Sequence, residues 1–264
     1  MNDVKHDEIR QAVRENYAAV ARADSGCGCG PACCTPVGLP AADILSRGIG
    51  YSESEVSAVP EGANMGLGCG NPQAIAELKP GEVVLDLGSG GGFDCFLAAR
   101  QVGESGHVIG VDMTPDMVSK ARGNAQKGGY SNVEFRLGEI EHLPVADGTV
   151  DAIISNCVLN LSPDKGQVFR DAFRVLKPGG RLAISDIVAT AVLPEEARRD
   201  LALYTGCMAG ASLIGDLEAM MKSAGFDQVR ITPKDESRAF ISEWPQGRKI
   251  EDFVISANIE AVKP

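Results

Sequence analysis

Three cysteines lie far apart in the 264-residue sequence, and each is set where a loop is expected. Cys69 has glycine on both sides, and Cys207 lies in a segment with a glycine at each end, which suggests an open loop. Cys157 directly follows Asn156 after an apolar run. A cysteine that only fills a core usually stands inside an apolar segment. Because thiols are soft ligands and nucleophiles, the sequence predicts thiol chemistry at these three positions.

A second group of thiols stands near the N-terminus, in a stretch without a helix or strand pattern. Its members are Cys27, Cys29, Cys33 and Cys34. The paired Cys-x-x-Cys spacing of many zinc sites is absent, and two adjacent cysteines fit poorly on one tetrahedral ion. A thiol relay, or delivery of a soft ion, fits this loop better than a metal site, which remains the alternative.

The glycine turn that holds Cys69 precedes the first predicted helix of the core, residues 72–78. The N-terminus of a helix carries a positive potential, which favours a thiolate. We therefore expect a flexible turn with a functional thiolate at Cys69.

The elements that position these thiols begin with a strand, a glycine turn and a helix. Residues 83–87 are an apolar run that suits a buried parallel strand, and the apolar residues 93–99 suit a helix. The turn between them carries Gly88, Gly90 and Gly92. A Cβ there would obstruct a ligand that approaches the backbone, so this unit is typical of a nucleotide-binding βαβ fold.

The spacing of the turn indicates which nucleotide is bound. The sixth position from Gly88 is Phe93, not the glycine of a dinucleotide fingerprint, and Asp112 lies 24 residues after Gly88, where a carboxylate binds ribose. This pattern suits an adenosine without phosphate. Asp86 and the three glycines resemble the acidic-x-Gly-x-Gly-x-Gly motif of class I S-adenosylmethionine-dependent methyltransferases. The alternative is a Rossmann-like enzyme that uses a nicotinamide.

Strand and helix patterns alternate after the glycine turn. Strands are predicted at 108–112, 133–137, 151–155 and 181–186, and helices from 115 and at 164–176. This alternation predicts an α/β, Rossmann-like sheet with helices on both faces and ligands at the carboxyl ends of the strands. The residues Asp112, Glu139, Asn156 and Cys157 all follow such ends.

The rest of the chain differs in pattern. An amphipathic helix is predicted at 5–22, a linker at 51–70, helices at 193–204 and 212–224, and strands at 229–233 and 253–261. We expect the last strands to close the sheet as an antiparallel hairpin and residues 190–224 to cover the active-site face. The predicted domains are an N-terminal helix with cysteine-rich loops (1–70), a Rossmann-like cofactor domain (71–188) and a C-terminal insertion with the hairpin (189–264).

Composition excludes several classes of partner. The net charge is −11, from 25 Lys and Arg against 36 Asp and Glu, which argues against a nucleic-acid substrate. No apolar run is long enough to span a membrane, and residues 1–8 are polar and acidic, unlike a signal peptide. Eight cysteines then predict a reducing, cytoplasmic location.

The methyl acceptor is constrained by the side chains available. An oxygen or nitrogen acceptor needs a general base, and none of His6, His107 and His142 is well placed for that role. Several soft thiolates without a base suit a thiophilic, trivalent centre with its own lone pair. Trivalent arsenic has these properties.

The segments around these thiols resemble the arsenite S-adenosylmethionine methyltransferases. The resemblance covers residues 25–262 and is carried by residues 66–72, 85–90, 110–114, 155–161 and 204–207. It implies methylation of arsenite for arsenic detoxification, with arsenic bound by Cys157 and Cys207 and then by Cys69. It also implies a disulfide during turnover between Cys69 and either Cys34 or Cys33, which thioredoxin or small thiols would reduce.

The resemblance further implies how S-adenosylmethionine is bound. Asp112 would bind the ribose, Gly88 and Gly90 would approach the methionine part, and Glu139 with Ile140 would flank the adenine. The complete predicted cofactor set is Asp86, Gly88, Ser89, Gly90, Asp112, Met113, Glu139, Ile140 and Asn156. Two other functions stay open from the residues alone: a methyltransferase of a small carbon or oxygen acceptor, and a non-catalytic arsenic-binding protein.

Overall fold

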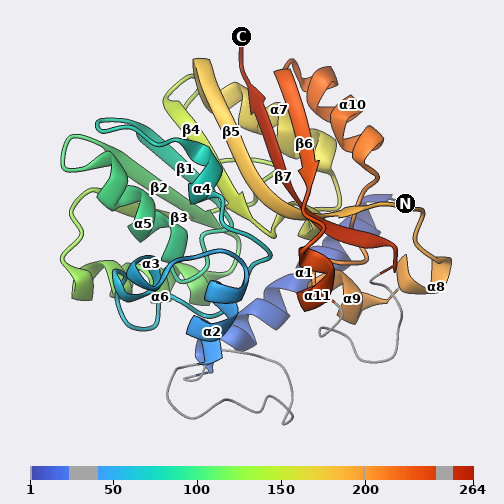
Figure 1. Ribbon diagram of the computed structural model, residues 1–264, viewed down its shortest axis with the longest axis horizontal. Helices are drawn as coiled ribbons and strands as arrows, with labels where there is room; N and C mark the ends of the chain where they lie inside the picture. Colours follow the sequence, from blue (N-terminus) through green and yellow to red (C-terminus); the bar gives the residue numbers. More distant parts are fainter. Residues whose placement is uncertain (1, 24–40, 199, 242–251) are drawn as a thin grey trace.

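The computed structural model describes residues 2–23, 41–198, 200–241 and 252–264 (Figure 1). Within these residues the centre is a seven-stranded sheet with the order β3-β2-β1-β4-β5-β7-β6. The strands are β1 (Val83–Leu87), β2 (His107–Asp112), β3 (Val133–Leu137), β4 (Val150–Asn156), β5 (Leu176–Ala189), β6 (Asp227–Pro233) and β7 (Val254–Val262). Strands β1 to β5 pair in parallel, whereas β7 runs antiparallel to β5 and β6. The predicted sheet and its antiparallel closing strands are confirmed.

Helices cover both faces of the sheet, as predicted. Val84 of β1 shares an apolar cluster with α5 (Phe93–Val102) and α6 (Pro115–Gly128). The next residue, Leu85, shares the opposite cluster with α7 (Lys165–Val175) and α10 (Ile214–Ala224). Successive side chains of a strand point to opposite faces, so the unbroken apolar run of β1 needs cover on both sides.

The N-terminal helix α1 (Asn2–Arg22) forms where the sequence predicts it. It packs against α6, α9 (Leu201–Thr205) and the short 3₁₀ helix Leu159–Leu161, and so lies at the carboxyl edge of the sheet (Figure 1). Three further helices, α2 (Ala41–Gly48), α3 (Glu53–Ser57) and α4 (Gln73–Ala76), lead into β1. The helix α3 lies inside the predicted linker, which did not foresee it, and a capping box of Ser52 and Glu55 stabilises its start.

The segment after β5 differs from the prediction. One helix at 193–204 was expected, but the structure has two short helices, α8 (Glu195–Arg198) and α9. The side chain of Asp200 accepts hydrogen bonds from the amides of Ala202 and Leu203, which starts a new helix there. Strand β5 also begins at Leu176 rather than residue 181. Leu176 already pairs with Val150 of β4, and the amide of Gly179 donates to the carbonyl of Lys263 near the end of the chain.

Only part of the predicted 190–224 cover lies over the carboxyl edge. Helix α10 packs on α7 and β6, on a face of the sheet, whereas α9 contacts α1 and the 3₁₀ helix. The short helix α11 (Ser237–Ile241), which has no counterpart in the prediction, packs against β7. No helix in the described ranges combines the length and apolarity needed to cross a membrane.

Candidate active site

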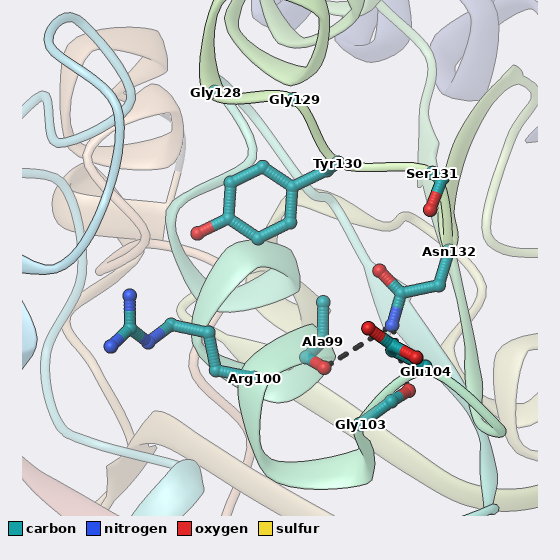
Figure 2. Close-up of a pocket in the computed structure, with 9 residues that line it drawn as sticks. All are labelled: Ala99, Arg100, Gly103, Glu104, Gly128, Gly129, Tyr130, Ser131 and Asn132. Atoms are coloured by element: carbon teal, nitrogen blue, oxygen red, sulfur yellow. Dashed lines mark hydrogen bonds between the residues drawn. The ribbon is translucent and has the colours of Figure 1, made fainter.

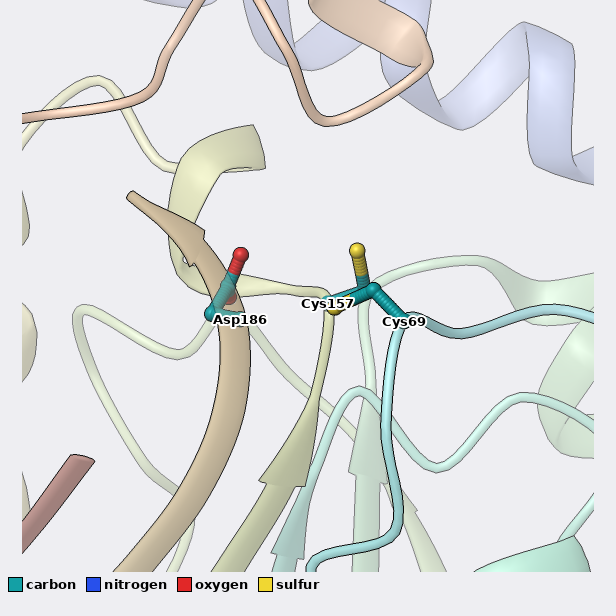
Figure 3. Close-up of side chains that lie close together, drawn as sticks. All are labelled: Cys69, Cys157 and Asp186. Atoms are coloured by element: carbon teal, nitrogen blue, oxygen red, sulfur yellow. The ribbon is translucent and has the colours of Figure 1, made fainter. Parts of the chain in front are cut away.

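Cys69, Cys157 and Cys207 meet in one apolar cluster at the carboxyl edge of the sheet. All three are free thiols, with exposed fractions of 1%, 7% and 4%. The sulfur atoms of Cys69 and Cys157 and a carboxylate oxygen of Asp186 lie within 4.8 Å of one another (Figure 3). Three thiols that are far apart in sequence therefore share one buried site.

Cys157 is held by a sharp turn at the end of β4. Its φ is 60°, in the left-handed region that residues with a Cβ rarely adopt. Its amide donates a 2.8 Å hydrogen bond to the carbonyl of Ser185 on β5. Strain of this kind persists only where the surroundings impose it, and it gathers at functional sites.

Cys207 occupies a second left-handed turn, just after α9, with φ of 63°. Its thiol donates a 2.7 Å hydrogen bond to the carbonyl of Cys157, and the amide of Asn160 donates to the carbonyl of Cys207 at 3.0 Å. The hydroxyl of Tyr17 lies 3.9 Å from the Cys207 sulfur and donates to the carbonyl of Thr205. The predicted loop is present, but it is packed rather than open.

Cys69 is fixed from several sides. Its amide donates to the side-chain oxygen of Asn156 at 3.0 Å, the hydroxyl of Ser256 donates to its carbonyl at 2.7 Å, and its thiol donates to the carbonyl of Ser185 at 3.7 Å. A Cβ on Gly68 would lie 2.7 Å from the Asn156 amide, and one on Gly70 would lie 2.8 Å from the Ser185 side chain. The two glycines therefore allow close packing, and the expectation of a flexible turn was wrong.

Burial keeps these thiols protonated. It raises the pKa of Cys69, and a hydrogen bond with Cys157 offsets this rise only in part. Hydrogen bonding with Cys207 lowers the pKa of Cys157, but contact with Cys69 and burial leave it well above its usual range. Contact with Cys157, together with burial, raises the pKa of Cys207. The predicted thiolate at Cys69 is therefore wrong for this form of the protein, because tertiary burial outweighs the nearby helix end.

Two charged side chains beside the thiols were not predicted from the sequence. Asp186, at 1% exposure, lies within the buried part of β5, and burial raises its pKa to about 6. Lys165 begins α7, donates to the carbonyl of Gly210 at 2.7 Å, and has its pKa lowered by burial to about 8. Asp186 ends a strand pattern much as Asp112 does, and that was the available signal. Nothing in the local sequence distinguishes Lys165 from a surface lysine.

The glycine turn after β1 contains a polar group that the described residues leave without a partner. The hydroxyl of Ser89 is buried without a hydrogen-bond partner, which is rare unless a ligand or water completes it. A Cβ on Gly88 would meet the Val158 side chain at 2.4 Å, so the turn requires glycine there. The carboxylate of Asp112 accepts from the amides of Gly90 and Thr114 at 2.9 and 2.8 Å. These residues fit an adenosine-type cofactor with a ribose at Asp112.

The other predicted cofactor residues lie around this turn in different settings. Asp86 is buried, its pKa is raised well above the usual range by burial and by Asp94, and it accepts a 3.2 Å hydrogen bond from the thiol of Cys95. Glu139 forms ion pairs with Arg10 and Arg14 of α1 at 3.4 and 3.3 Å. The N-terminal helix is therefore joined to the predicted adenine side of the site.

Three of the predicted residues have mainly apolar or structural contacts. Ile140 lies in the apolar core, and Met113 packs against the thiol cluster. Asn156 donates to the carbonyl of Gly70 at 2.8 Å and to the hydroxyl of Tyr51 at 3.0 Å, in addition to its bond with Cys69. Its side chain thereby fastens the Cys69 turn to β4.

The predicted thiol relay lies outside the described residues. Cys27, Cys29, Cys33 and Cys34 all belong to the range 24–40, so their predicted roles, including the Cys34 or Cys33 disulfide with Cys69, stay predictions.

A surface pocket lies elsewhere and has different chemistry. Figure 2 shows it between the end of α5 and the start of β3, with Arg100, Tyr130 and Asn132 in its wall. The side chain of Asn132 donates to the carbonyls of Ala99 and Gly103. The lining residues include no cysteine, and they stand at the amino ends of the strands, opposite the thiol cluster.

Comparison with known proteins agrees with this arrangement. A family model described as a methyltransferase domain matches residues 78–225. The chain is 54% identical to an arsenite methyltransferase of Halobacterium salinarum, over 98% of this chain and 67% of that protein. It is 43% identical to arsenite methyltransferases of Aquipseudomonas alcaligenes and Homo sapiens, over 76% and 56% of this chain and 57% and 42% of those proteins.

A solved structure supports the same assignment. An arsenic(III) S-adenosylmethionine methyltransferase from Chlamydomonas reinhardtii superimposes with a TM-score of 0.60 at 32% identity, covering 86% of this chain and 74% of that chain. The chain spans about two thirds of the length of the Halobacterium protein and less of the other two relatives. With its glycine turn and its gathered thiols, the chain belongs to the arsenite methyltransferase family of S-adenosylmethionine-dependent methyltransferases.

Proposed function

We propose that this protein methylates trivalent arsenic, which it holds with the thiolates of Cys69, Cys157 and Cys207. The observation that carries the proposal is the meeting of these three thiols in one buried cluster beside the glycine turn. The membership of the chain in the arsenite methyltransferase family supports the same reaction. S-adenosylmethionine, when bound, supplies a methyl group made electrophilic by its sulfonium.

The protonated state of the thiols is compatible with arsenic capture. Arsenous acid and three thiols give a trithiolate and three molecules of water, so each thiol proton leaves as part of a water molecule. No net charge is then buried, which avoids the cost of placing an unpaired ion in an apolar site. The raised pKa values of Cys69, Cys157 and Cys207 therefore suit a neutral arsenic complex.

The chain's own contribution to the reaction is positioning. The two left-handed turns at Cys157 and Cys207 hold a pair of thiols in a fixed relation, and Asn156 holds the turn of Cys69 against β4. A reactant held in a near-attack arrangement gains rate without further chemistry from the protein. Asp112 is the group proposed to bind the ribose of the cofactor, and Gly88 and Gly90 are proposed to approach its methionine part.

The redox cycle is also part of the proposal. The methylated product is formally pentavalent, and two thiols return two electrons to arsenic as they form a disulfide. We assign that disulfide to Cys69 with Cys34 or Cys33, and its reduction to thioredoxin or a small thiol. The free thiols of the described cysteines fit a reducing, cytoplasmic setting, which we propose for the protein.

Incubation with arsenite, a small thiol and methyl-labelled cofactor, followed by separation of arsenic species, tests the function. We expect labelled methylarsenicals from the wild type and none from Cys157→Ser or Cys207→Ser, although both variants should still bind the cofactor. The variant Cys95→Ser serves as the matched control for arsenic capture, because Cys95 is buried outside the cluster. Wild-type turnover in either cluster variant, or arsenic that binds but stays unmethylated, would contradict the proposal.

A further inference from the structure

The thiol cluster contains a carboxylate that trivalent arsenic does not need. Three thiolates complete the trigonal pyramid of arsenic, yet an oxygen of Asp186 lies within 4.8 Å of the sulfur atoms of both Cys69 and Cys157 (Figure 3). All three side chains are buried. A carboxylate at this position offers a ligand of a different kind, since oxygen suits harder ions than sulfur does.

The carboxylate of Asp186 is oriented by its own hydrogen bonds. It accepts from the amide of Ile187 at 2.7 Å, the amide of Leu159 at 2.8 Å and the side-chain amide of Asn160 at 3.0 Å. The amide of Val158 acts on the same carboxylate as a further hydrogen-bond donor. Hydrogen bonds of this kind are what fixes and tunes a carboxylate that binds a metal.

The two thiols share an anchor with that carboxylate. The amide of Cys157 and the thiol of Cys69 both donate to the carbonyl of Ser185, which directly precedes Asp186. The Cys69 thiol and the main chain of Cys157 are thus both held by β5, at the residue next to Asp186. Sites built on strands hold their geometry better than sites on free loops.

We propose that Cys69, Cys157 and Asp186 form a binding site for a zinc-class divalent cation, and that this ion competes with arsenic for the two thiols. Zinc takes sulfur at about 2.3 Å and carboxylate oxygen at about 2.0–2.2 Å in one tetrahedron. The fourth position is open to a water molecule or to the thiol of Cys207. The competition, unlike the binding itself, rests on the proposed arsenic site.

Both the protons released and the net charge of the site can be accounted for when the cation binds. The ion displaces one proton from each of the two thiols, and these protons pass to solvent as the two zinc–sulfur bonds form. Two thiolates and one carboxylate leave a net charge of −1 around the ion. Lys165 acts electrostatically on Asp186, and Lys234 acts on Cys69, so positive charge stands beside both kinds of ligand.

Zinc titration of the full chain against a chromophoric chelator tests the site. The four N-terminal cysteines are replaced by serine in every sample, so that the cluster supplies the thiols. We expect one tight zinc ion per chain, and at least about a tenfold loss of zinc affinity in Asp186→Asn. The same variant should keep its affinity for phenylarsine oxide, which needs only a pair of thiols. Asp151→Asn is the matched control. Asp151 also accepts a hydrogen bond from a main-chain amide, but it lies at the amino end of β4, away from the thiols.

A second variant covers the case in which Asp186→Asn fails to fold. Cys69→Ser should lose zinc but still bind phenylarsine oxide through Cys157 and Cys207. Unchanged zinc affinity in these variants, or simultaneous binding of zinc and phenylarsine oxide by the parent protein, would overturn the proposal. None of these readouts requires methylation, so a failure of the zinc site and a failure of the proposed function are distinguishable.

Discussion

The thiol of Cys207 donates a 2.7 Å hydrogen bond to the main-chain carbonyl of Cys157. Both residues adopt left-handed backbone conformations, with φ of 63° and 60°. Each such conformation costs of order 1–3 kcal/mol for a residue other than glycine. The surrounding structure must therefore impose the geometry of this pair, and the hydrogen bonds that do so are open to test.

Asn160→Ala should loosen the pair without removing a thiol. The Asn160 amide donates to the carbonyls of Cys207 and Ile187, and leaving such buried groups without a donor costs about 1–3 kcal/mol. We expect the KM for arsenite to rise and the affinity for the cofactor to stay constant. Asn132→Ala is the control, since Asn132 also bonds two carbonyls, in the pocket of Figure 2. If both variants lose stability and neither changes KM, Asn160 has no positioning role.

Gly68→Ala should displace Cys69. Its φ is +133°, and a Cβ would lie 2.7 Å from the Asn156 amide that holds the turn. The expected results are a loss of about 1–3 kcal/mol in stability and a lower affinity for arsenite. Gly148→Ala separates the two effects, because Gly148 has a φ of +62° but nothing within 4 Å of an added Cβ. Equal arsenite affinity in the two variants would contradict this account.

Tyr17→Phe should change the ionisation of Cys207. The hydroxyl of Tyr17 lies 3.9 Å from the Cys207 sulfur, and this hydrogen bond opposes the other causes that raise the pKa of Cys207. Without it the pKa should rise further, so alkylation of Cys207 by iodoacetamide should need a higher pH. Mass spectrometry of the Cys207 peptide across a pH series provides the measurement. An unshifted profile would mean that Tyr17 does not tune this thiol.

The Asp186 carboxyl should make stability fall as pH rises. Burial raises its pKa from 3.8 to about 6, so its contribution is complete below pH 3.8 and is lost as pH rises through about 6. A shift of this size corresponds to about 3 kcal/mol at about 1.4 kcal/mol for each pKa unit. Denaturant unfolding across this window should show the wild type losing stability relative to Asp186→Asn as pH rises.

The control for this pH dependence is Asp151→Asn. Burial raises the pKa of Asp151, but the ammonium of Lys177 holds it below the usual range overall. Its contribution therefore has the opposite sign and is lost as pH falls. Parallel curves for the wild type and Asp186→Asn would show that this carboxyl does not govern the decline.

The sheet was predictable because its signals are local. The run from Val83 to Leu87 and the glycines after it define β1 and its turn, and β3 has the bounds that the sequence predicts. The helix break at Asp200 was missed because the apolar spacing continues across it, although the aspartate is itself a capping residue.

The three cysteines could be predicted from their neighbours in the sequence, whereas the side chains that contact them could not. Cys69 and Cys207 stand out among glycines in the sequence. Asp186 lies 29 positions from Cys157 and 117 from Cys69, and Tyr17 lies 190 from Cys207, so a local pattern does not contain these contacts. The same limit explains the wrong ionisation of Cys69, since its burial under β5 and β7 is a tertiary property.

X-ray absorption at the arsenic edge tests the central claim most directly. The sample is the full chain with Cys27, Cys29, Cys33 and Cys34 replaced by serine and loaded with one equivalent of arsenite. We predict three sulfur neighbours around arsenic and no oxygen, and fewer sulfur neighbours in Cys157→Ser. An arsenic that keeps oxygen ligands in the parent protein, or three sulfur neighbours that survive the loss of Cys157, would contradict the shared thiolate site.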